Sequence, residues 1–290
     1  FKEEAYLYYC YLEFYIQNKP EEVFRFIKEK DLDIKGNQLF AFMAANLAIN
    51  HQMGAYARKV MEDRDKGPQF TYLPAMDYEM GMIYLDHLEL DSAIYFLQRF
   101  VNNFKGNFYI KDVLHKLSWA YYLKGDIQQA NHYKELIKQK GNTETDADKA
   151  ALREAQEPGW PNPDLLRPRL LSDGGYLEEA LQLLNQKKVT DFSSVEDKIE
   201  FAYRLGRIYD ELGQQDKAIP FYEATIRAGS QLPEYYAARA AWQMGLIYEK
   251  RGDKNKARNY YNQCLSMNEQ EYKNSLDQRA KAGINRLSGK

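Results

Sequence analysis

Cysteine is nearly absent from this chain, with two in 290 residues, and an excess of basic charge is missing altogether. Cys10 and Cys264 stand at opposite ends of the sequence, so no disulfide framework is indicated. The 40 lysines and arginines are balanced by 42 acidic residues, which argues against a protein dedicated to nucleic acid. No apolar run approaches the roughly 20 residues of a membrane-spanning helix. Disulfide-rich, nucleic-acid-binding and membrane-spanning proteins are therefore not expected.

Signatures of catalytic chemistry are also lacking. The four histidines, His51, His87, His115 and His132, show none of the spacings that bind zinc. No glycine-rich phosphate-binding loop, dinucleotide fingerprint or Gly-x-Ser-x-Gly turn occurs. We therefore expect a non-enzymatic protein with no catalytic, cofactor-binding or metal-binding residues.

Helical periodicity is what the chain has in abundance. Apolar residues recur at i, i+3, i+4 and i+7 between Pro and Gly punctuation, and alternating runs of Val, Ile and Thr are missing, so the chain is expected to be all-α. The pattern predicts helices at about 3–17, 21–30, 38–51, 54–63, 75–86, 91–104, 108–123, 127–139, 146–156, 164–172, 176–186, 194–212, 215–228, 233–251, 254–267 and 269–287.

One motif recurs in register along these helices. A small residue is followed by a tyrosine three positions later and by an alanine twelve positions later. We expect the small residue and the alanine where two antiparallel helices cross closely, and the tyrosine in the gap between one pair and the next. The copies are Gly81–Tyr84–Ala93, Ser118–Tyr121–Ala130, Gly206–Tyr209–Ala218 and Gly245–Tyr248–Ala257.

These copies resemble the tetratricopeptide repeat, W-x2-L-G-x2-Y followed by Ala and an aromatic residue. The resemblance implies a right-handed α-α superhelix, a solenoid of about seven helix pairs with a C-terminal capping helix, in a protein that we expect to be bacterial. The arrays fall at 1–140 and 164–290. Between them lies the irregular segment 141–163, in which Pro158, Pro161 and Pro163 rule out a regular helix through its last part, 157–163. This segment is interpreted as a hinge, a lid, an additional contact site or a connector whose Trp160 fills a gap.

In this family the first helices of successive repeats line a concave groove that receives peptides or partner proteins. A subclass binds C-terminal carboxylates through a Lys/Asn clamp, but Phe42 and Asn46 stand at the equivalent place, so a chaperone tail is not expected as ligand. Carried over residue by residue, the groove positions are Tyr78, Met82, His115, Trp119, Tyr122, Tyr203, Arg207, Asp210, Arg239, Trp242, Leu246 and Glu249.

The sequence leaves three functions open. The first is a non-enzymatic scaffold that binds a protein or peptide in the groove. The second is a periplasmic or outer-membrane-associated lipoprotein module, and the third is a recruiting or regulatory domain of a longer protein. The chain begins with Phe1 and not with Met, so we expect the native N-terminus to be missing. A cytoplasmic or periplasmic location and a homo-oligomeric state both stay open.

Overall fold

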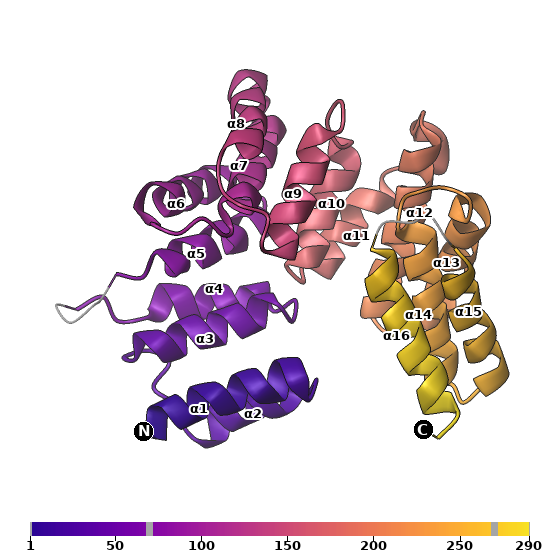
Figure 1. Cartoon of the computed structure of the whole chain (residues 1–290), viewed down its shortest axis with the longest axis horizontal. Coiled ribbons are helices and arrows are strands. Elements are labelled where there is room, and N and C mark those ends of the chain that lie inside the picture. Colours follow the sequence, from indigo (N-terminus) through magenta and orange to yellow (C-terminus); the bar gives the residue numbers. More distant parts are fainter. Residues whose placement is uncertain (1, 68–71, 268–271, 290) are drawn as a thin grey trace. The chain divides into compact units, whose positions relative to one another are not determined.

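The computed structural model describes residues 2–67, 72–267 and 272–289, and these contain helices and no strand (Figure 1). The all-α expectation is therefore confirmed. The elements are α1 (Lys2–Tyr11), η1 (Leu12–Ile16), α2 (Pro20–Glu29), α3 (Gln38–Ile49), α4 (Gly54–Asp63), α5 (Pro74–Asp86), α6 (Leu90–Asn103), α7 (Ile110–Lys124), α8 (Ile127–Gln139), α9 (Asp146–Gln156), α10 (Pro163–Asp173), α11 (Leu177–Asn185), η2 (Val189–Asp191), α12 (Val195–Glu211), α13 (Gln215–Gly229), α14 (Tyr236–Lys250), α15 (Lys254–Ser266) and α16 (Lys273–Leu287).

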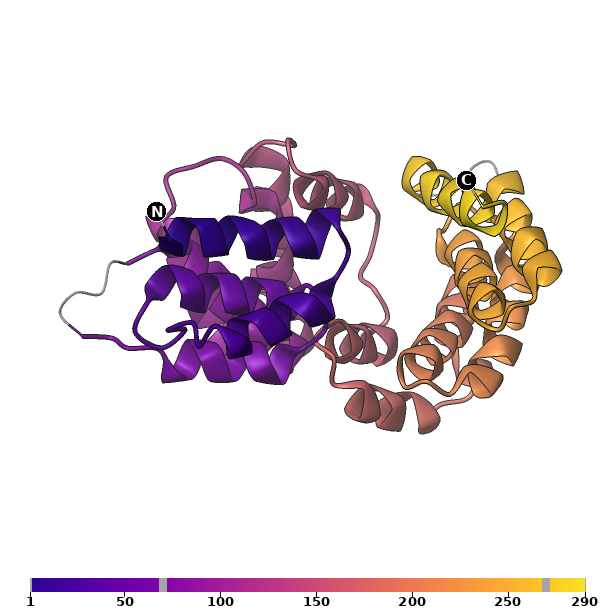
Figure 2. The same ribbon diagram turned by 90° about the horizontal axis from the view of Figure 1, so that it is seen from below.

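The chain divides into two compact units. Unit 1 consists of residues 1–160 and 170–176, and unit 2 of residues 161–169 and 177–290, so the division passes through α10. Within each unit, successive helices can be followed by colour as they stack on one another (Figure 2). The sequence pattern predicts that segment 141–163 interrupts the repeats. Most of this segment falls within unit 1.

Helix starts follow local sequence chemistry. The Asn37 side chain accepts hydrogen bonds from the backbone N–H groups of Leu39 (3.0 Å) and Phe40 (3.3 Å) at the start of α3. Thr145 and Ser194 cap α9 and α12 in the same way. Such side chains provide acceptors for N–H groups that have no partner within the helix. The expected first helix, 3–17, is divided, because α1 gives way to a π-helical turn at η1.

The repeated small residues lie where helices approach most closely. A Cβ atom at Gly81 would stand 2.4 Å from Leu97, and one at Gly245 would stand 2.3 Å from Tyr261. In each case the neighbour belongs to the second helix of the same pair. Ser118 takes the small position in α7, and its hydroxyl donates to the carbonyl of His115 (2.7 Å).

Each of the four repeated tyrosines stacks on an aromatic residue of the following helix. The ring centroids are 5.4–5.8 Å apart and the planes lie within 12° of parallel. The partner stands three residues after the repeated alanine, so the motif contains a second aromatic position that was not part of the sequence pattern. The pairs are Tyr84–Phe96, Tyr121–Tyr133, Tyr209–Phe221 and Tyr248–Tyr260.

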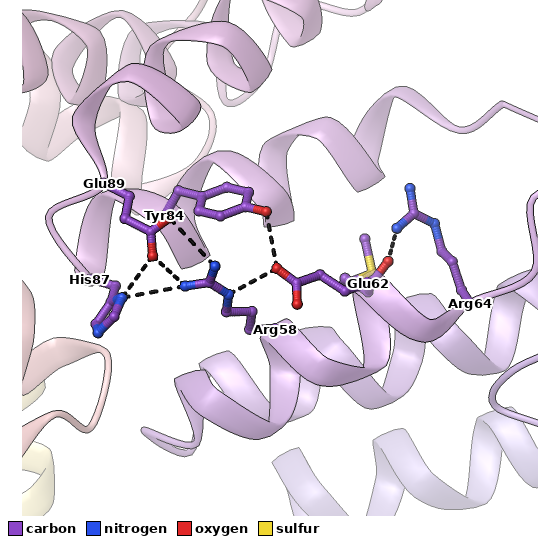
Figure 3. Close-up of polar contacts among 7 residues, drawn as sticks. Arg58, Glu62, Arg64, Tyr84, His87 and Glu89 are labelled. Carbon is purple, nitrogen blue, oxygen red and sulfur yellow. Dashed lines mark hydrogen bonds and ion pairs between the residues drawn. The ribbon is translucent and has the colours of Figure 1, made fainter.

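Tyr84 also belongs to a polar network that joins α4 to α5 and the α5–α6 connection (Figure 3). Its hydroxyl donates to Glu62 Oε1 (3.2 Å), and the Arg58 guanidinium lies over its ring, 5.1 Å from the centroid. Arg58 Nε also donates to Glu62 (2.9 Å), and its terminal nitrogens bind Glu89, which in turn contacts His87 Nδ1 (2.9 Å). Hydrogen bonding to Glu89 raises the pKa of Arg58, so this link between successive helix pairs is ionic.

Candidate functional site

Three first helices of unit 2, α12, α14 and α16, form one continuous face. Helix α14 packs against both α12 and α16 (Figure 1). Helix α16 takes the place of the first helix of a further repeat, because a Cβ atom at Gly283 would stand 2.5 Å from the Tyr261 ring of α15. We call these three helices the α12–α14–α16 face. It carries the predicted groove residues from Tyr203 to Glu249.

Aromatic rings and guanidinium groups gather at one part of this face. Tyr203 on α12 is 1% exposed, and its ring centroid lies 5.3 Å from that of Tyr236 and 6.0 Å from that of Tyr235. The Arg239 guanidinium lies 6.0 Å from the Tyr235 centroid. Burial raises the pKa of Tyr203, and the positive charge of nearby Arg239 opposes that shift. The Tyr203 hydroxyl is therefore a neutral donor.

Trp242 and Leu246 provide the apolar part of the face. Both side chains are partly buried on α14 and pack against the core of unit 2. The Arg279 guanidinium of α16 lies 5.2 Å from the Trp242 ring centroid. An arginine above an indole ring gains a favourable cation–π interaction and keeps its N–H edges free for a ligand.

Carboxylates occupy another part of the same face. Asp210 Oδ2 accepts a hydrogen bond from the Tyr222 hydroxyl (3.3 Å), and burial raises the pKa of Asp210. Glu249 accepts hydrogen bonds from Arg286 at 2.9 Å, which lowers the pKa of Glu249. Arg207 Nε donates to Glu211 (2.8 Å). Each of these acids has at least one hydrogen-bond partner within unit 2.

The corresponding face in unit 1 is covered by α9. This helix packs against α7 and α8, and Glu154 lies 3.4 Å from His115 Nε2. His115 and Trp119 are only 6% and 2% exposed. Tyr122 stacks on Trp160 with centroids 4.8 Å apart. The three groove residues predicted on α7 are thus brought together, but beneath residues of the segment 141–163.

Asp148 fixes α9 to the start of α7. Its fully buried carboxylate accepts hydrogen bonds from the backbone N–H groups of Tyr109 (2.7 Å) and Asp112 (3.1 Å) and from the Thr145 hydroxyl (2.7 Å). In the sequence, this contact is signalled only by Thr145 and Asp148 standing at a predicted helix start. Nearby, the predicted groove residue Tyr78 is half-buried and donates to Asp112 Oδ2 (3.0 Å), while Met82 is half-buried on α5.

The described part of the chain has neither a metal-binding cluster nor an exposed thiol. No group of three or more His, Cys, Asp or Glu side chains that could hold a metal ion occurs there. Both cysteines are buried and free, and burial raises their pKa values to about 11 for Cys10 and about 12 for Cys264. Such thiols stay protonated at neutral pH and are poor nucleophiles. None of the helices described has the length and apolar character needed to cross a membrane.

Comparison with known families matches residues 198–270 to the tetratricopeptide repeat, a segment that runs from α12 through α15. No curated protein matches the chain. Similar solved structures include the crystal structure of NprR in complex with its cognate peptide NprX, which is 14% identical, with 98% of this chain and 82% of that chain covered and a TM-score of 0.37. They also include the C-terminal part of a repeat-containing protein from Cytophaga hutchinsonii, which is 17% identical, with 96% and 99% covered and a TM-score of 0.37.

Proposed function

Because this chain is a tetratricopeptide-repeat protein, we propose that it binds a segment of a partner protein on the α12–α14–α16 face. Tyr, Trp and Arg are the residue types that contribute most to binding energy at protein interfaces. This face presents all three within a single unit.

The observation that carries the proposal is a difference in exposure between two equivalent helices. On α7, His115 and Trp119 are buried beneath α9. On α14, the residues at the same repeat positions, Trp242 and Leu246, remain partly exposed. The equivalent surface of unit 1 therefore already holds a helix of the same chain, whereas that of unit 2 presents its aromatic and apolar groups to a ligand.

A displayed peptide library, selected against the intact protein, tests this proposal. Binders are expected to protect backbone amides of α12, α14 and α16 from hydrogen exchange. They should also lose most of their affinity for a Trp242→Ala, Leu246→Ser variant whose circular dichroism and melting temperature match those of the parent protein.

Tyr95→Ala is the matched control, because Tyr95 is an aromatic residue that is 55% exposed on α6 and belongs to unit 1. The control variant should bind the selected peptides as the parent protein does. Peptides that bind both variants equally and protect helices outside α12, α14 and α16 would refute the assignment of the site.

A further inference from the structure

Two arginines on the α12–α14–α16 face differ from their neighbours in lacking an acidic partner. Arg204 pairs with Glu200 (2.7 Å) on α12. Among the residues that the structure describes, Arg239 and Arg279 form no ion pair and no hydrogen bond, and Arg239 Nε is a buried donor without an acceptor. Burial lowers the pKa of Arg279, and the positive charge of Arg239 lowers it further. Within the described part of unit 2, no acidic side chain pairs with either of these two positive charges.

The Tyr203 hydroxyl is a second group without a partner. The side chain is 1% exposed, and its oxygen is buried with no hydrogen-bond partner among the described residues. Buried polar groups almost always have a partner, so an unsatisfied one calls for an explanation. Tyr203 and Arg239 both lie against the Tyr235 ring, since the Tyr203 centroid and the Arg239 guanidinium are each 6.0 Å from the Tyr235 centroid. A donor hydroxyl and donor N–H groups therefore share one place around this ring, and no acceptor bonds to them among the described residues.

We propose that acidic side chains of the partner segment occupy this place, with carboxylate oxygens accepting hydrogen bonds from Arg239, Arg279 and the Tyr203 hydroxyl. This inference rests on the proposed function and names the chemistry of the ligand. The planar guanidinium group matches a carboxylate in geometry, and charge-assisted hydrogen bonds are stronger than neutral ones. Tyr235 and Trp242 lie against the two guanidinium groups and would hold their N–H edges toward the ligand.

Unit 1 provides an independent precedent in the same chain. The helix that covers its equivalent face brings carboxylates to it, since Asp148 accepts backbone N–H bonds from α7 and Glu154 contacts His115. An acidic segment on unit 2 would repeat this arrangement between two molecules. The two excess charges on α14 and α16 suit separate carboxylates along a peptide.

The test uses two synthetic octapeptides with blocked ends, one alternating Glu with Leu and the other alternating Gln with Leu. Calorimetric titration of the intact protein should show the Glu peptide binding at least about tenfold more tightly, as expected when charged hydrogen bonds are lost. Arg239→Gln, Arg279→Gln should reduce that affinity by about tenfold or more. Arg227→Gln, Arg258→Gln, a matched change at exposed arginines on α13 and α15, should leave it within about twofold.

Tyr203→Phe adds a sharper readout. The change removes a hydroxyl that has no partner in the described structure, so thermal stability should be maintained or raised, whereas affinity for the Glu peptide should fall by a few-fold. If the hydroxyl had only a structural role, its removal would change thermal stability and leave the affinity for the Glu peptide unchanged. Loss of stability without loss of affinity would therefore contradict the inference.

The remaining outcomes separate this inference from the proposed function. In one outcome, the Glu and Gln peptides bind the parent protein equally well and both lose their affinity for the Trp242→Ala, Leu246→Ser variant. That result would support the binding face and overturn the proposal of an acidic ligand. No binding of the Glu peptide would also overturn it, because the library selection tests the face independently. Inorganic phosphate that displaces the Glu peptide at equal concentration would assign the site to a free anion instead.

Discussion

At the scale of single residues, the fold depends on close contacts that leave no room for a methyl group. The Tyr261 ring lies between two glycines, since a Cβ atom at Gly245 or at Gly283 would stand 2.3 Å or 2.5 Å from it. The Tyr261 hydroxyl also donates to Glu249, so the ring cannot move aside without losing this bond. Alanine at position 245 would therefore force α14 and α15 apart.

We expect Gly245→Ala to lower the free energy of unfolding by about 1–3 kcal/mol through overpacking, despite the gain of about 1 kcal/mol in helix propensity. Urea denaturation followed by circular dichroism measures the change. Lys250→Ala, an exposed substitution in the same helix, should change stability by less than about 0.5 kcal/mol. An unchanged or raised stability of Gly245→Ala would show that the ring adjusts freely.

The sequence predicted the packing residues better than the exposure of the groove residues. Small residues, tyrosines and alanines recur, so their contacts could be expected from the pattern. The stacked partner of each tyrosine could also have been found, because an aromatic residue follows each repeated alanine by three positions. The burial of Trp119 could not, because it depends on α9, which lies outside the repeat.

At the scale of elements, hydrogen bonds from backbone N–H groups to Asp148 link α9 to the start of α7. We expect Asp148→Ala to release α9, because the N–H groups of Tyr109 and Asp112 would lose an ionic acceptor worth about 1.5–3 kcal/mol per hydrogen bond. Hydrogen exchange should rise in residues 110–124 and 146–156, and the fluorescence of Trp119 should report new exposure to water.

Asp146→Ala is the control for this prediction. Asp146 is an acidic residue at the start of the same helix, but its side chain is 96% exposed and pairs with Lys149 (3.0 Å). The Asp146→Ala variant should leave hydrogen exchange in α7 unchanged. If Asp148→Ala behaved in the same way, α9 would be held by its apolar contacts, chiefly Ala151 and Ala155, which are 1% and 2% exposed.

Element boundaries were largely predictable, whereas the docking of α9 was not. Pro and Gly between periodic segments placed most helices within a few residues, including 146–156 inside the irregular segment. The position of α9 depends on hydrogen bonds between Asp148 and backbone groups more than thirty residues away. No local pattern encodes such a contact, so the sequence favoured a connector and left a lid open as an alternative.

At the scale of the whole molecule, the division into two units predicts that a perturbation in one is felt little in the other. Repeat arrays transmit strain mainly between adjacent repeats. Glu79 on α5 offers a perturbation confined to unit 1. Its side chain is buried and accepts a hydrogen bond from Asn46 Nδ2 (2.8 Å). Burial raises the pKa of Glu79 from 4.5 to about 7, and the hydrogen bond from Asn46 opposes the shift.

The sign of the resulting pH effect follows from proton binding. Between pH 4.5 and pH 7 the folded protein holds the Glu79 proton and the unfolded chain releases it, so stability falls as pH rises through this range. The shift corresponds to a loss of stability on the order of 3 kcal/mol by pH 8.

We expect hydrogen exchange in α3 and α5 to accelerate between pH 5 and pH 8, after correction for intrinsic rates, while the amides of α12–α15 keep their protection. Glu79→Gln, which retains the hydrogen-bond acceptor and cannot ionise, should remove the effect in unit 1. Parallel loss of protection in both units would mean that the chain unfolds as one cooperative body, and a pH response that persists in Glu79→Gln would assign it to another group.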